Sequence, residues 1–202
     1  MIKLLLCCVI GYLLGAIPFA LVIGKVFYKK DIRNYGSGNL GGGNAGRVLG
    51  KKAGLSVMTL DILKVSLAML ITRFVVGGEN AMVIVGLCAA LGHCFPVFAR
   101  FKGGKAVATM YGYLFGMWVI AGYSPLMFFL PLAAFLLILY LTKIIALGSI
   151  GSAIVVTVFS AVCAGSWVVT GALAVFTAVI IWRHRANLER IRNHTENKIS
   201  WM

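Results

Sequence analysis

The sequence predicts an all-α integral membrane protein, a bundle of about seven transmembrane helices with its N-terminus outside and its C-terminus in the cytoplasm. Two observations indicate this fold class. The mean hydropathy is +0.97, and 61% of the 202 residues are hydrophobic whereas 12% are charged, a composition far from that of soluble globular domains. The apolar residues also gather into runs near the roughly 20 residues that a helix needs to cross a bilayer. One membrane-embedded domain over residues 1–202 is therefore expected.

Seven apolar segments follow one another along the chain, and each is expected to form a helix. They cover residues 3–26, 53–76, 81–98, 106–122, 125–142, 146–164 and 167–182. The first lacks a small-residue cleavage site, which predicts a retained helix rather than a signal peptide. Within it, Gly11 and Gly15 have the spacing of closely packed helices, and Pro18 predicts a kink. Several later segments are short, which favours tilted or partly irregular spans.

The cations lie on alternate connections, which predicts the topology. Sixteen of the 19 Lys and Arg residues fall in or beside the connections 27–52, 99–105 and 143–146 or in the tail 183–202, whereas the opposite connections contain one charged residue, Glu79. The positive-inside rule makes the cation-rich side cytoplasmic. Contact with lipid headgroups alone is the competing function for these cations.

The stretch GSGNLGGGNAGR at residues 36–47, with Gly41 near its centre, has the composition of an anion-binding loop. Its glycines let successive backbone N–H groups turn toward one point and form a nest for phosphate oxygens. Ser37, Asn39 and Asn44 add neutral donors, and Arg47 can hold a phosphate with two parallel hydrogen bonds. A flexible loop in which the glycines only turn the chain is the alternative.

A second polar stretch, HCFPVFARFKGGKA at residues 93–106, ends in Gly103, Gly104 and Lys105 directly before an apolar segment. A Gly-Gly-Lys turn at the start of a helix directs free backbone N–H groups and an ammonium at one anion. His93 at the beginning of the stretch fits a satisfied interfacial histidine as well as a functional one.

The third stretch, RHRANLERIRNHTENK at residues 183–198, places His184 and Asn187 on one face if the last helix continues through it. A histidine and an amide presented together suit proton handling and hydrogen bonding. A basic amphipathic tail on anionic headgroups is the alternative.

Within the membrane, Asp61 and Lys64 lie three residues apart in the second segment and can neutralise each other. Intramembrane ionisable residues are functional candidates, but this pair is better explained as a brace for the bundle or for a nearby polar loop. The five cysteines lie in apolar runs without zinc-ligand spacing, which indicates neither a metal site nor a disulfide framework. No cofactor and no nucleic-acid partner are expected.

The three motifs, in this order and together with LDILK at residues 60–64 and ALGS at 146–149, resemble the bacterial acyl-phosphate-dependent glycerol-3-phosphate acyltransferase family. The similarity runs from about Ile10 to Lys198. It implies a seven-helix enzyme of the cytoplasmic (inner) membrane, acting as a monomer with its active site facing the cytoplasm. Such an enzyme transfers a fatty acyl group from acyl phosphate to the sn-1 hydroxyl of glycerol 3-phosphate, in the first step of phospholipid synthesis. Its partners are these two substrates and membrane lipid.

The resemblance also implies residue roles where the motifs match. Arg47, Lys105, His184 and Asn187 hold the phosphate of glycerol 3-phosphate, and Ser37 lies near the reacting groups. The remaining matched positions, which the resemblance assigns to substrate binding, are Asn39, Gly41, Asn44, Gly103, Gly104 and Ser149.

Three positions depart from the family pattern. This chain has Gly43 where the family usually has threonine, Ala106 where it has glycine, and Ala146 where it has serine. A hydroxyl lost at position 43 removes a possible phosphate donor worth on the order of 1 kcal/mol. Ala106 is harmless if its φ is negative and strained if the turn needs a positive φ. The departures leave open weaker glycerol 3-phosphate binding or a different acceptor.

An acyl phosphate is already activated, so direct attack by the substrate hydroxyl needs no enzyme nucleophile and no metal. His184, Ser37 or the substrate's own phosphate can take the proton, and the sequence does not choose among them. The histidine box of soluble-headed acyl-CoA enzymes is absent, because His184 and Glu189, five residues apart, diverge by about 140° on a helix. An anion or lipid transporter and a non-catalytic lipid-binding relative are the alternatives from other classes.

Overall fold

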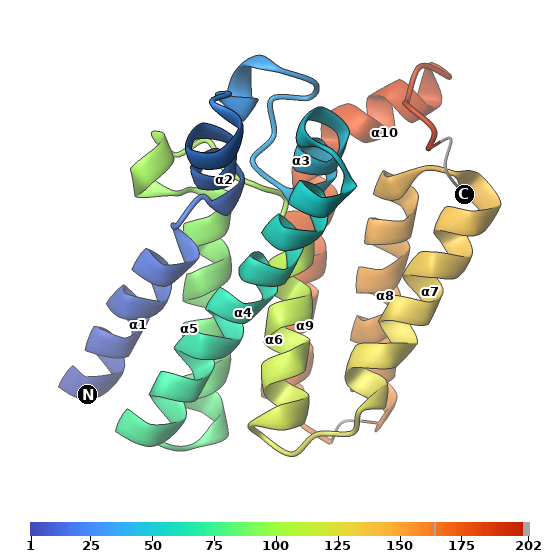
Figure 1. The fold of residues 1–202 in the computed structure, drawn as a ribbon. Coiled ribbons are helices and arrows are strands. Elements are labelled where there is room, and N and C mark those ends of the chain that lie inside the picture. The colour runs from blue at the N-terminus through green and yellow to red at the C-terminus, as the bar shows by residue number, and fades with distance from the viewer. Residues whose placement is uncertain (164, 200–202) are drawn as a thin grey trace. The chain divides into compact units, whose positions relative to one another are not determined.

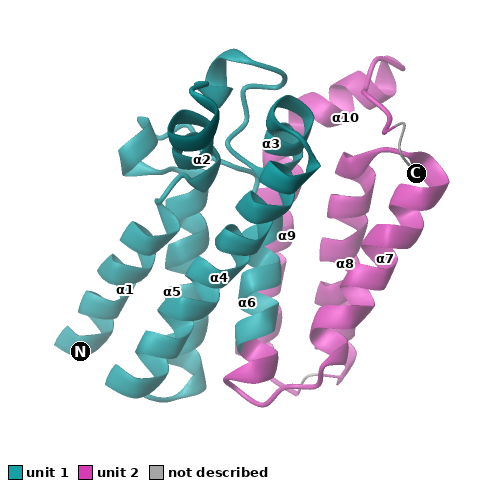
Figure 2. Ribbon diagram, in the orientation of Figure 1, with its two compact units in different colours: residues 1–116 teal, residues 117–202 magenta. Residues whose placement is uncertain are grey.

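The computed structural model describes residues 1–163 and 165–199, and within them all regular structure is helical (Figure 1). The helices are α1 (Ile2–Gly15), α2 (Phe19–Tyr28), the 3₁₀ turn η1 (Ile32–Asn34), α3 (Gly42–Leu49), α4 (Lys51–Val75), α5 (Glu79–Cys94), the 3₁₀ turn η2 (Val97–Ala99), α6 (Val107–Val119), α7 (Leu126–Thr142), α8 (Ile145–Cys163), α9 (Trp167–Arg183) and α10 (Arg185–Arg192). The expected all-α class is confirmed for the described residues. The chain divides into two compact units, unit 1 (Met1–Gly116) and unit 2 (Met117–Met202), which Figure 2 colours separately.

Three helical stretches in the described ranges are long and apolar enough to cross a membrane: Lys51–Val75, Glu79–Ala99 and Ile145–Cys163. Two bent pairs, α1 with α2 and α9 with α10, also qualify if each pair is one span, which raises the number to five. α6 and α7 are apolar but shorter. Two of the expected segments are therefore short helices, and the first is not a single helix.

The expected helix over 3–26 is broken at the predicted kink. α1 ends at Gly15, Pro18 precedes α2, and the two helices are bent by 40°. Proline has no backbone N–H to continue the helical ladder, so the chain interrupts the helix and starts a new one. The predicted kink is confirmed, and it takes the form of a complete break between two helices.

The small residues of α1 let it lie directly against α5. A Cβ on Gly15 would collide with the carbonyl of Ala89, and a Cβ on Gly11 would lie 2.7 Å from Cγ1 of Val85. Only glycine permits this backbone approach, because any larger residue would push the helices apart. The predicted packing function of both glycines is confirmed.

The cytoplasmic connection expected over 27–52 is more ordered than a loop, because it contains η1 and α3. Its apolar side chains are buried with residues of α2, α4 and η2 in one core of unit 1: Ala20, Leu21, Ile23, Ile32, Leu40, Ala45, Leu49, Ala53, Val57 and Ala99. Burial of Ala45 and Leu49, four residues apart on one face, explains why this glycine-rich segment becomes helical. The core fixes α3 against α4.

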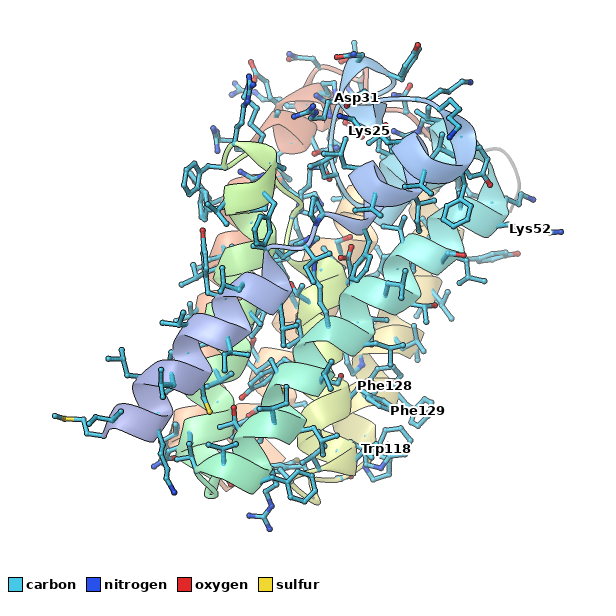
Figure 3. All side chains as sticks on the ribbon, turned by 60° about the vertical axis from the view of Figure 1, so that its left-hand side comes forward. Lys25, Asp31, Lys52, Trp118, Phe128 and Phe129 are labelled. Atoms are coloured by element: carbon cyan, nitrogen blue, oxygen red, sulfur yellow. The ribbon has the colours of Figure 1, made fainter. Side chains whose placement is uncertain are left out.

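In unit 2, α8 packs against both α7 and α9. Hydroxyl pairs join α8 to α9: Thr157 Oγ1 lies 2.9 Å from Thr177 Oγ1, and Ser160 Oγ lies 2.8 Å from Thr170 Oγ1. Such pairs satisfy polar side chains inside an apolar bundle. At the far end from the motif segments of this unit, three aromatic rings, Trp118, Phe128 and Phe129, lie together (Figure 3).

Candidate active site

The first motif is organised by Asn44. Its side chain is 4% exposed, and its Oδ1 accepts a hydrogen bond of 2.9 Å from the backbone N–H of Ser37. Its Nδ2 donates to the carbonyl oxygens of Ile32 at 3.3 Å and Tyr35 at 3.2 Å. The amide is therefore used to fold the turn that presents Ser37 on the surface.

The helix that follows, α3, begins without a side-chain cap. Gly41, the N-cap of α3, has extended backbone, and no side chain caps the first turn. The N–H groups at the start of a helix carry a partial positive charge and point outward along the axis. Arg47 is exposed on the same helix. Gly43 lies in the first turn, and a Cβ there would meet nothing within 4 Å.

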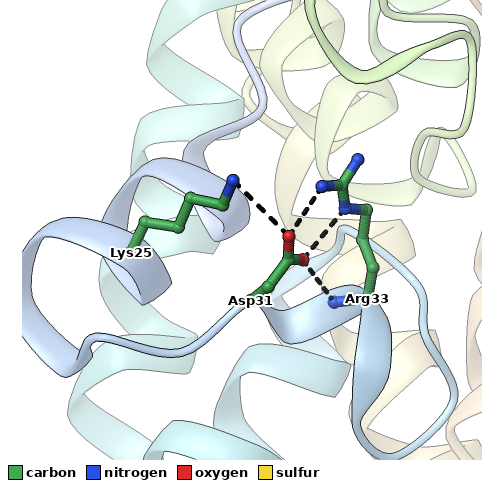
Figure 4. A network of polar contacts seen from close by, with 3 residues as sticks. All are labelled: Lys25, Asp31 and Arg33. Atoms are coloured by element: carbon green, nitrogen blue, oxygen red, sulfur yellow. Dashed lines mark hydrogen bonds and ion pairs between the residues drawn. The ribbon is translucent and has the colours of Figure 1, made fainter.

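An ion-pair network fixes the turn before the motif (Figure 4). Arg33 donates to Asp31 from its Nε to Oδ1 at 2.9 Å, from its Nη2 to Oδ2 at 2.6 Å, and from its backbone N–H to Oδ1 at 3.1 Å. Lys25 Nζ lies 3.5 Å from Oδ2 of the same carboxylate. The Arg33 guanidinium holds the pKa of Asp31 well below its usual range, against the opposing effect of desolvation. Lys25 and Arg33 are thus engaged in stabilising this turn through Asp31.

The second motif forms a tight turn at the start of α6. Gly103 and Gly104 are buried, and the backbone N–H of Gly104 donates to the carbonyl of His93 at 3.0 Å. Ala106 has φ +64°, and its carbonyl accepts the first helical hydrogen bond, from Met110 at 2.8 Å. The turn therefore does need a positive φ, and alanine adopts it at a cost of about 1 kcal/mol relative to a relaxed residue. Lys105 is half-buried between the glycines and the helix.

Both motif segments of unit 1 rest on the same core. Ala99, just before the second motif turn, is buried with Ala45 and Leu49 of α3 in that core. The same hydrophobic core therefore packs beneath both motif segments.

The third motif lies in unit 2, and the last helix does not continue unbroken through it. α9 ends at Arg183 and α10 begins at Arg185, with a bend of 54°. His184 stands at the break, 4% exposed, and its Nδ1 lies 2.8 Å from the carbonyl oxygen of Ile180. A carbonyl only accepts, so Nδ1 carries the proton and the neutral ring has its lone pair on Nε2. This tautomer can accept a proton or, once charged, donate to an anion.

Asn187 and Arg190 meet at one carboxylate in α10 and the tail. Asn187 Nδ2 donates to Glu196 Oε1 at 2.8 Å, and Arg190 Nε donates to Glu196 Oε2 at 2.7 Å. The backbone N–H of Ile199 donates to the carbonyl of Lys143 at 2.8 Å, which ties the tail to the turn after α7. The carboxylate therefore orients the Asn187 amide beside the helix break.

Ser149 lies inside α8 rather than in the connection before it. It is 2% exposed, and its hydroxyl donates to the carbonyl of Ile145 at 2.9 Å. Asn39 is half-buried beside Gly41, where a Cβ would lie 3.1 Å from the Asn39 amide oxygen. In the described part of the chain, no three His, Cys, Asp or Glu side chains gather as a metal site would require.

The first and second motifs thus lie in unit 1, and Ser149, His184 and Asn187 lie in unit 2. Sequence reasoning missed one buried cluster, in which His93 of the second motif contacts the intramembrane pair Asp61 and Lys64. The signal was present, since two charges in an apolar segment and a histidine at the end of the next are costly to bury separately.

Known proteins resemble the chain over nearly its whole length. A family model described as Glycerol-3-phosphate acyltransferase matches residues 5–194. The glycerol-3-phosphate acyltransferase of Listeria monocytogenes is 45% identical over 203 residues, covering 100% of this chain and 99% of the relative. That of Enterococcus faecalis is 41% identical over 209 residues, covering 98% and 93%. The solved structure of PlsY (YgiH), an integral membrane glycerol 3-phosphate acyltransferase, in its glycerol 3-phosphate form has a TM-score of 0.89 at 36% identity, covering 98% of this chain and 96% of that one.

Proposed function

Because the chain belongs to the glycerol-3-phosphate acyltransferase family, we propose that it transfers a fatty acyl group from acyl phosphate to the sn-1 hydroxyl of glycerol 3-phosphate. The products are lysophosphatidic acid and inorganic phosphate. The observation that supports this most is the pair of helix starts in unit 1, at α3 and α6, each preceded by glycines. Lys105 lies just before α6, and Arg47 lies in the last turn of α3. The solved relatives are described in glycerol 3-phosphate and lysophosphatidic acid forms, which correspond to a substrate and a product of this reaction.

Acyl phosphate is the donor in this proposal because it is already activated, so its reaction needs no enzyme nucleophile and no metal. The substrate hydroxyl attacks the acyl carbon, the bond from that carbon to the phosphate oxygen breaks, and phosphate leaves with the electron pair. No acyl-enzyme forms and no metal takes part. The protein holds two anions together and neutralises charge on the departing phosphate, which cations in a partly desolvated site do more strongly than in water.

We assign Arg47 and Lys105 to the phosphate of glycerol 3-phosphate, with Gly41, Gly103 and Gly104 around it; the N–H of Gly104 is used by the turn itself, where it donates to the carbonyl of His93. Lys105 follows the buried glycine turn directly, so its backbone is fixed. A fixed ammonium and a planar guanidinium bind phosphate oxygens from different directions.

We assign Ser37 to the reacting groups, and His184 to the phosphate or to proton transfer. The lone pair on Nε2 of neutral His184 suits a general base, and the protonated ring suits a phosphate ligand. Asn187, Ser149 and Asn39 complete the substrate contacts, whereas Asn44 acts by shaping the turn of Ser37.

The membrane setting belongs to the same proposal. Seven spans, with α6 and α7 crossing as short helices, an outside N-terminus and a cytoplasmic C-terminus follow from the cation distribution. The enzyme then acts as a monomer and as one domain over 1–202, in the cytoplasmic membrane of a bacterium, and takes glycerol 3-phosphate from the cytoplasm.

The experiment that tests the proposal compares donors. Purified protein in a lipid mesophase receives glycerol 3-phosphate with either palmitoyl phosphate or palmitoyl-CoA, and lysophosphatidic acid is measured. Product from palmitoyl phosphate alone is expected. Product from palmitoyl-CoA alone would refute the donor, and anion uptake into vesicles without either product would favour a transporter.

A further inference from the structure

Three ionisable side chains of unit 1 form a cluster in its apolar interior. Asp61 and Lys64 of α4 and His93 of α5 are 1%, 4% and 6% exposed. Lys64 Nζ lies 2.6 Å from Asp61 Oδ1 and 3.2 Å from His93 Nδ1. Charges buried at such depth are costly unless each finds partners, so a cluster of this kind needs matched geometry.

The contacts of Lys64 determine the state of His93. An ammonium only donates: Lys64 Nζ lies 3.0 Å from the carbonyl oxygen of Ile17 and 3.2 Å from His93 Nδ1. Asp61 Oδ1, at 2.6 Å, is its ion-pair partner, although neither carboxylate oxygen of Asp61 accepts a hydrogen bond of good geometry. Asp61 Oδ1 is 3.6 Å from His93 Nδ1, too far for a hydrogen bond of its own. His93 Nδ1 therefore accepts from Lys64, and the neutral ring carries its proton on Nε2.

The opposite side of this imidazole faces the second motif. A Cβ on Gly104 would collide with Nε2 of His93 and lie 2.5 Å from its Cε1. The Gly104 N–H donates to the His93 carbonyl at 3.0 Å, and a Cβ on Gly103 would collide with that same carbonyl. Gly103 and Gly104, directly before Lys105, thus pack against the carbonyl and the ring of His93.

We propose that His93 is a positioning residue for glycerol 3-phosphate binding: Lys64 and Asp61 lock its ring in the Nε2–H tautomer, and the ring seats the Gly103–Gly104 turn that aims Lys105. The inference rests on the proposed function, since it gives the turn a phosphate to bind. It links the break between α1 and α2, through the carbonyl of Ile17, to the anion site. Lys64 thereby stabilises the helix bundle through the carbonyl of Ile17 and, through His93, fixes the Gly103–Gly104 turn.

The kinetic test uses His93→Asn. The asparagine oxygen can still accept from Lys64, so the buried ammonium keeps its third partner, but the part of the ring beneath Gly104 is lost. We expect the KM for glycerol 3-phosphate to rise on the order of tenfold, which corresponds to the loss of one hydrogen bond between charged groups. The KM for palmitoyl phosphate is expected to stay unchanged, whereas the melting temperature falls, because the smaller side chain leaves a cavity at a buried position. The same substitution at the exposed His194 is the matched control and leaves both constants unchanged.

A readout independent of turnover tests the tautomer. In protein labelled with 15N-histidine, the His93 resonances are identified by their loss in His93→Asn, and a proton on Nε2 alone is expected. The paired substitutions Asp61→Leu and Lys64→Met remove both charges together, so no unpaired ion remains. With them, His93 is expected to lose the single tautomer, and calorimetric affinity for glycerol 3-phosphate to fall by about the same factor as in His93→Asn.

Three results overturn the inference: a proton on Nδ1 of His93 in the unaltered protein, a wild-type KM for glycerol 3-phosphate in His93→Asn, or an equal rise of both substrate constants. A failure of the proposed function looks different. The unaltered protein would then produce no lysophosphatidic acid, while the tautomer and the calorimetric affinity would still report on His93.

Discussion

Gly43 allows the sharpest test of the anion site at the start of α3. It lies in the first turn of α3, it is exposed, and a Cβ there would meet no atom within 4 Å. Threonine therefore fits without displacing a neighbour, and its hydroxyl would lie beside the uncapped N–H groups of the helix. Alanine adds the same Cβ without a hydroxyl. The pair Gly43→Thr and Gly43→Ala thus separates hydrogen bonding from helix propensity.

The magnitude follows from the difference between the two variants. Alanine stabilises a helix by up to about 1 kcal/mol relative to glycine, so Gly43→Ala should raise the melting temperature and leave the KM for glycerol 3-phosphate unchanged. A hydroxyl donating to the bound phosphate adds about 1 kcal/mol, which corresponds to a roughly fivefold lower KM for Gly43→Thr than for Gly43→Ala. Phosphate release at varied glycerol 3-phosphate measures both constants. Equal KM values in the two variants would show that the phosphate does not bind at this end of α3.

Three further predictions concern unit 1. If Arg47 and Lys105 bind one phosphate, Arg47→Ala and Lys105→Ala each raise the KM for glycerol 3-phosphate. The free-energy changes of the two single variants should then not add up to that of the double variant. Strict additivity in this double-mutant cycle would count against a shared site. Ala106→Val should lower the free energy of unfolding by about 2 kcal/mol, because a β-branched residue at φ +64° is strained, whereas Ala106→Gly should be near neutral; denaturation of both variants checks this. The folded-state pKa of Asp31 is depressed, so its stabilisation is present above the ordinary value near 3.9 and is lost as the pH falls below it. The melting-temperature gap between wild type and Asp31→Asn should therefore be larger at pH 7 than at pH 3, and a gap independent of pH would contradict the ion pair.

The features that sequence reasoning predicted correctly depend on local chemistry. Hydropathy indicated the helical class, Pro18 the break after α1, and the spacing of Gly11 and Gly15 the close approach to α5. Each of these follows from a property of the residue itself, such as a missing N–H or a missing side chain.

The features that it missed depend on contacts between distant parts of the chain. α3 forms inside a glycine-rich connection because Ala45 and Leu49 find a core supplied by other elements. The bend after α9 places His184 at a helix end, where its Nδ1 is held by the carbonyl of Ile180. No periodicity in the sequence reports such partners.

The side-chain roles in the first motif were the hardest to predict. The Asn44 side chain could donate hydrogen bonds to a substrate, yet its amide forms hydrogen bonds with three backbone groups of the turn around Ser37. An amide offers the same donors to a ligand and to its own chain, so only the folded structure separates the two uses. The sequence left the sign of φ at Ala106 open, because alanine argues against a positive φ whereas the glycine usual at this position permits it.

In the proposed reaction, acyl transfer is direct and releases phosphate. The most direct measurement follows inorganic phosphate and lysophosphatidic acid together, in one time course, with palmitoyl phosphate in the presence and absence of glycerol 3-phosphate. Both products are expected in equal amounts, and neither is expected to form without glycerol 3-phosphate. A burst of phosphate without glycerol 3-phosphate, or phosphate release that outpaces lysophosphatidic acid, would contradict direct transfer.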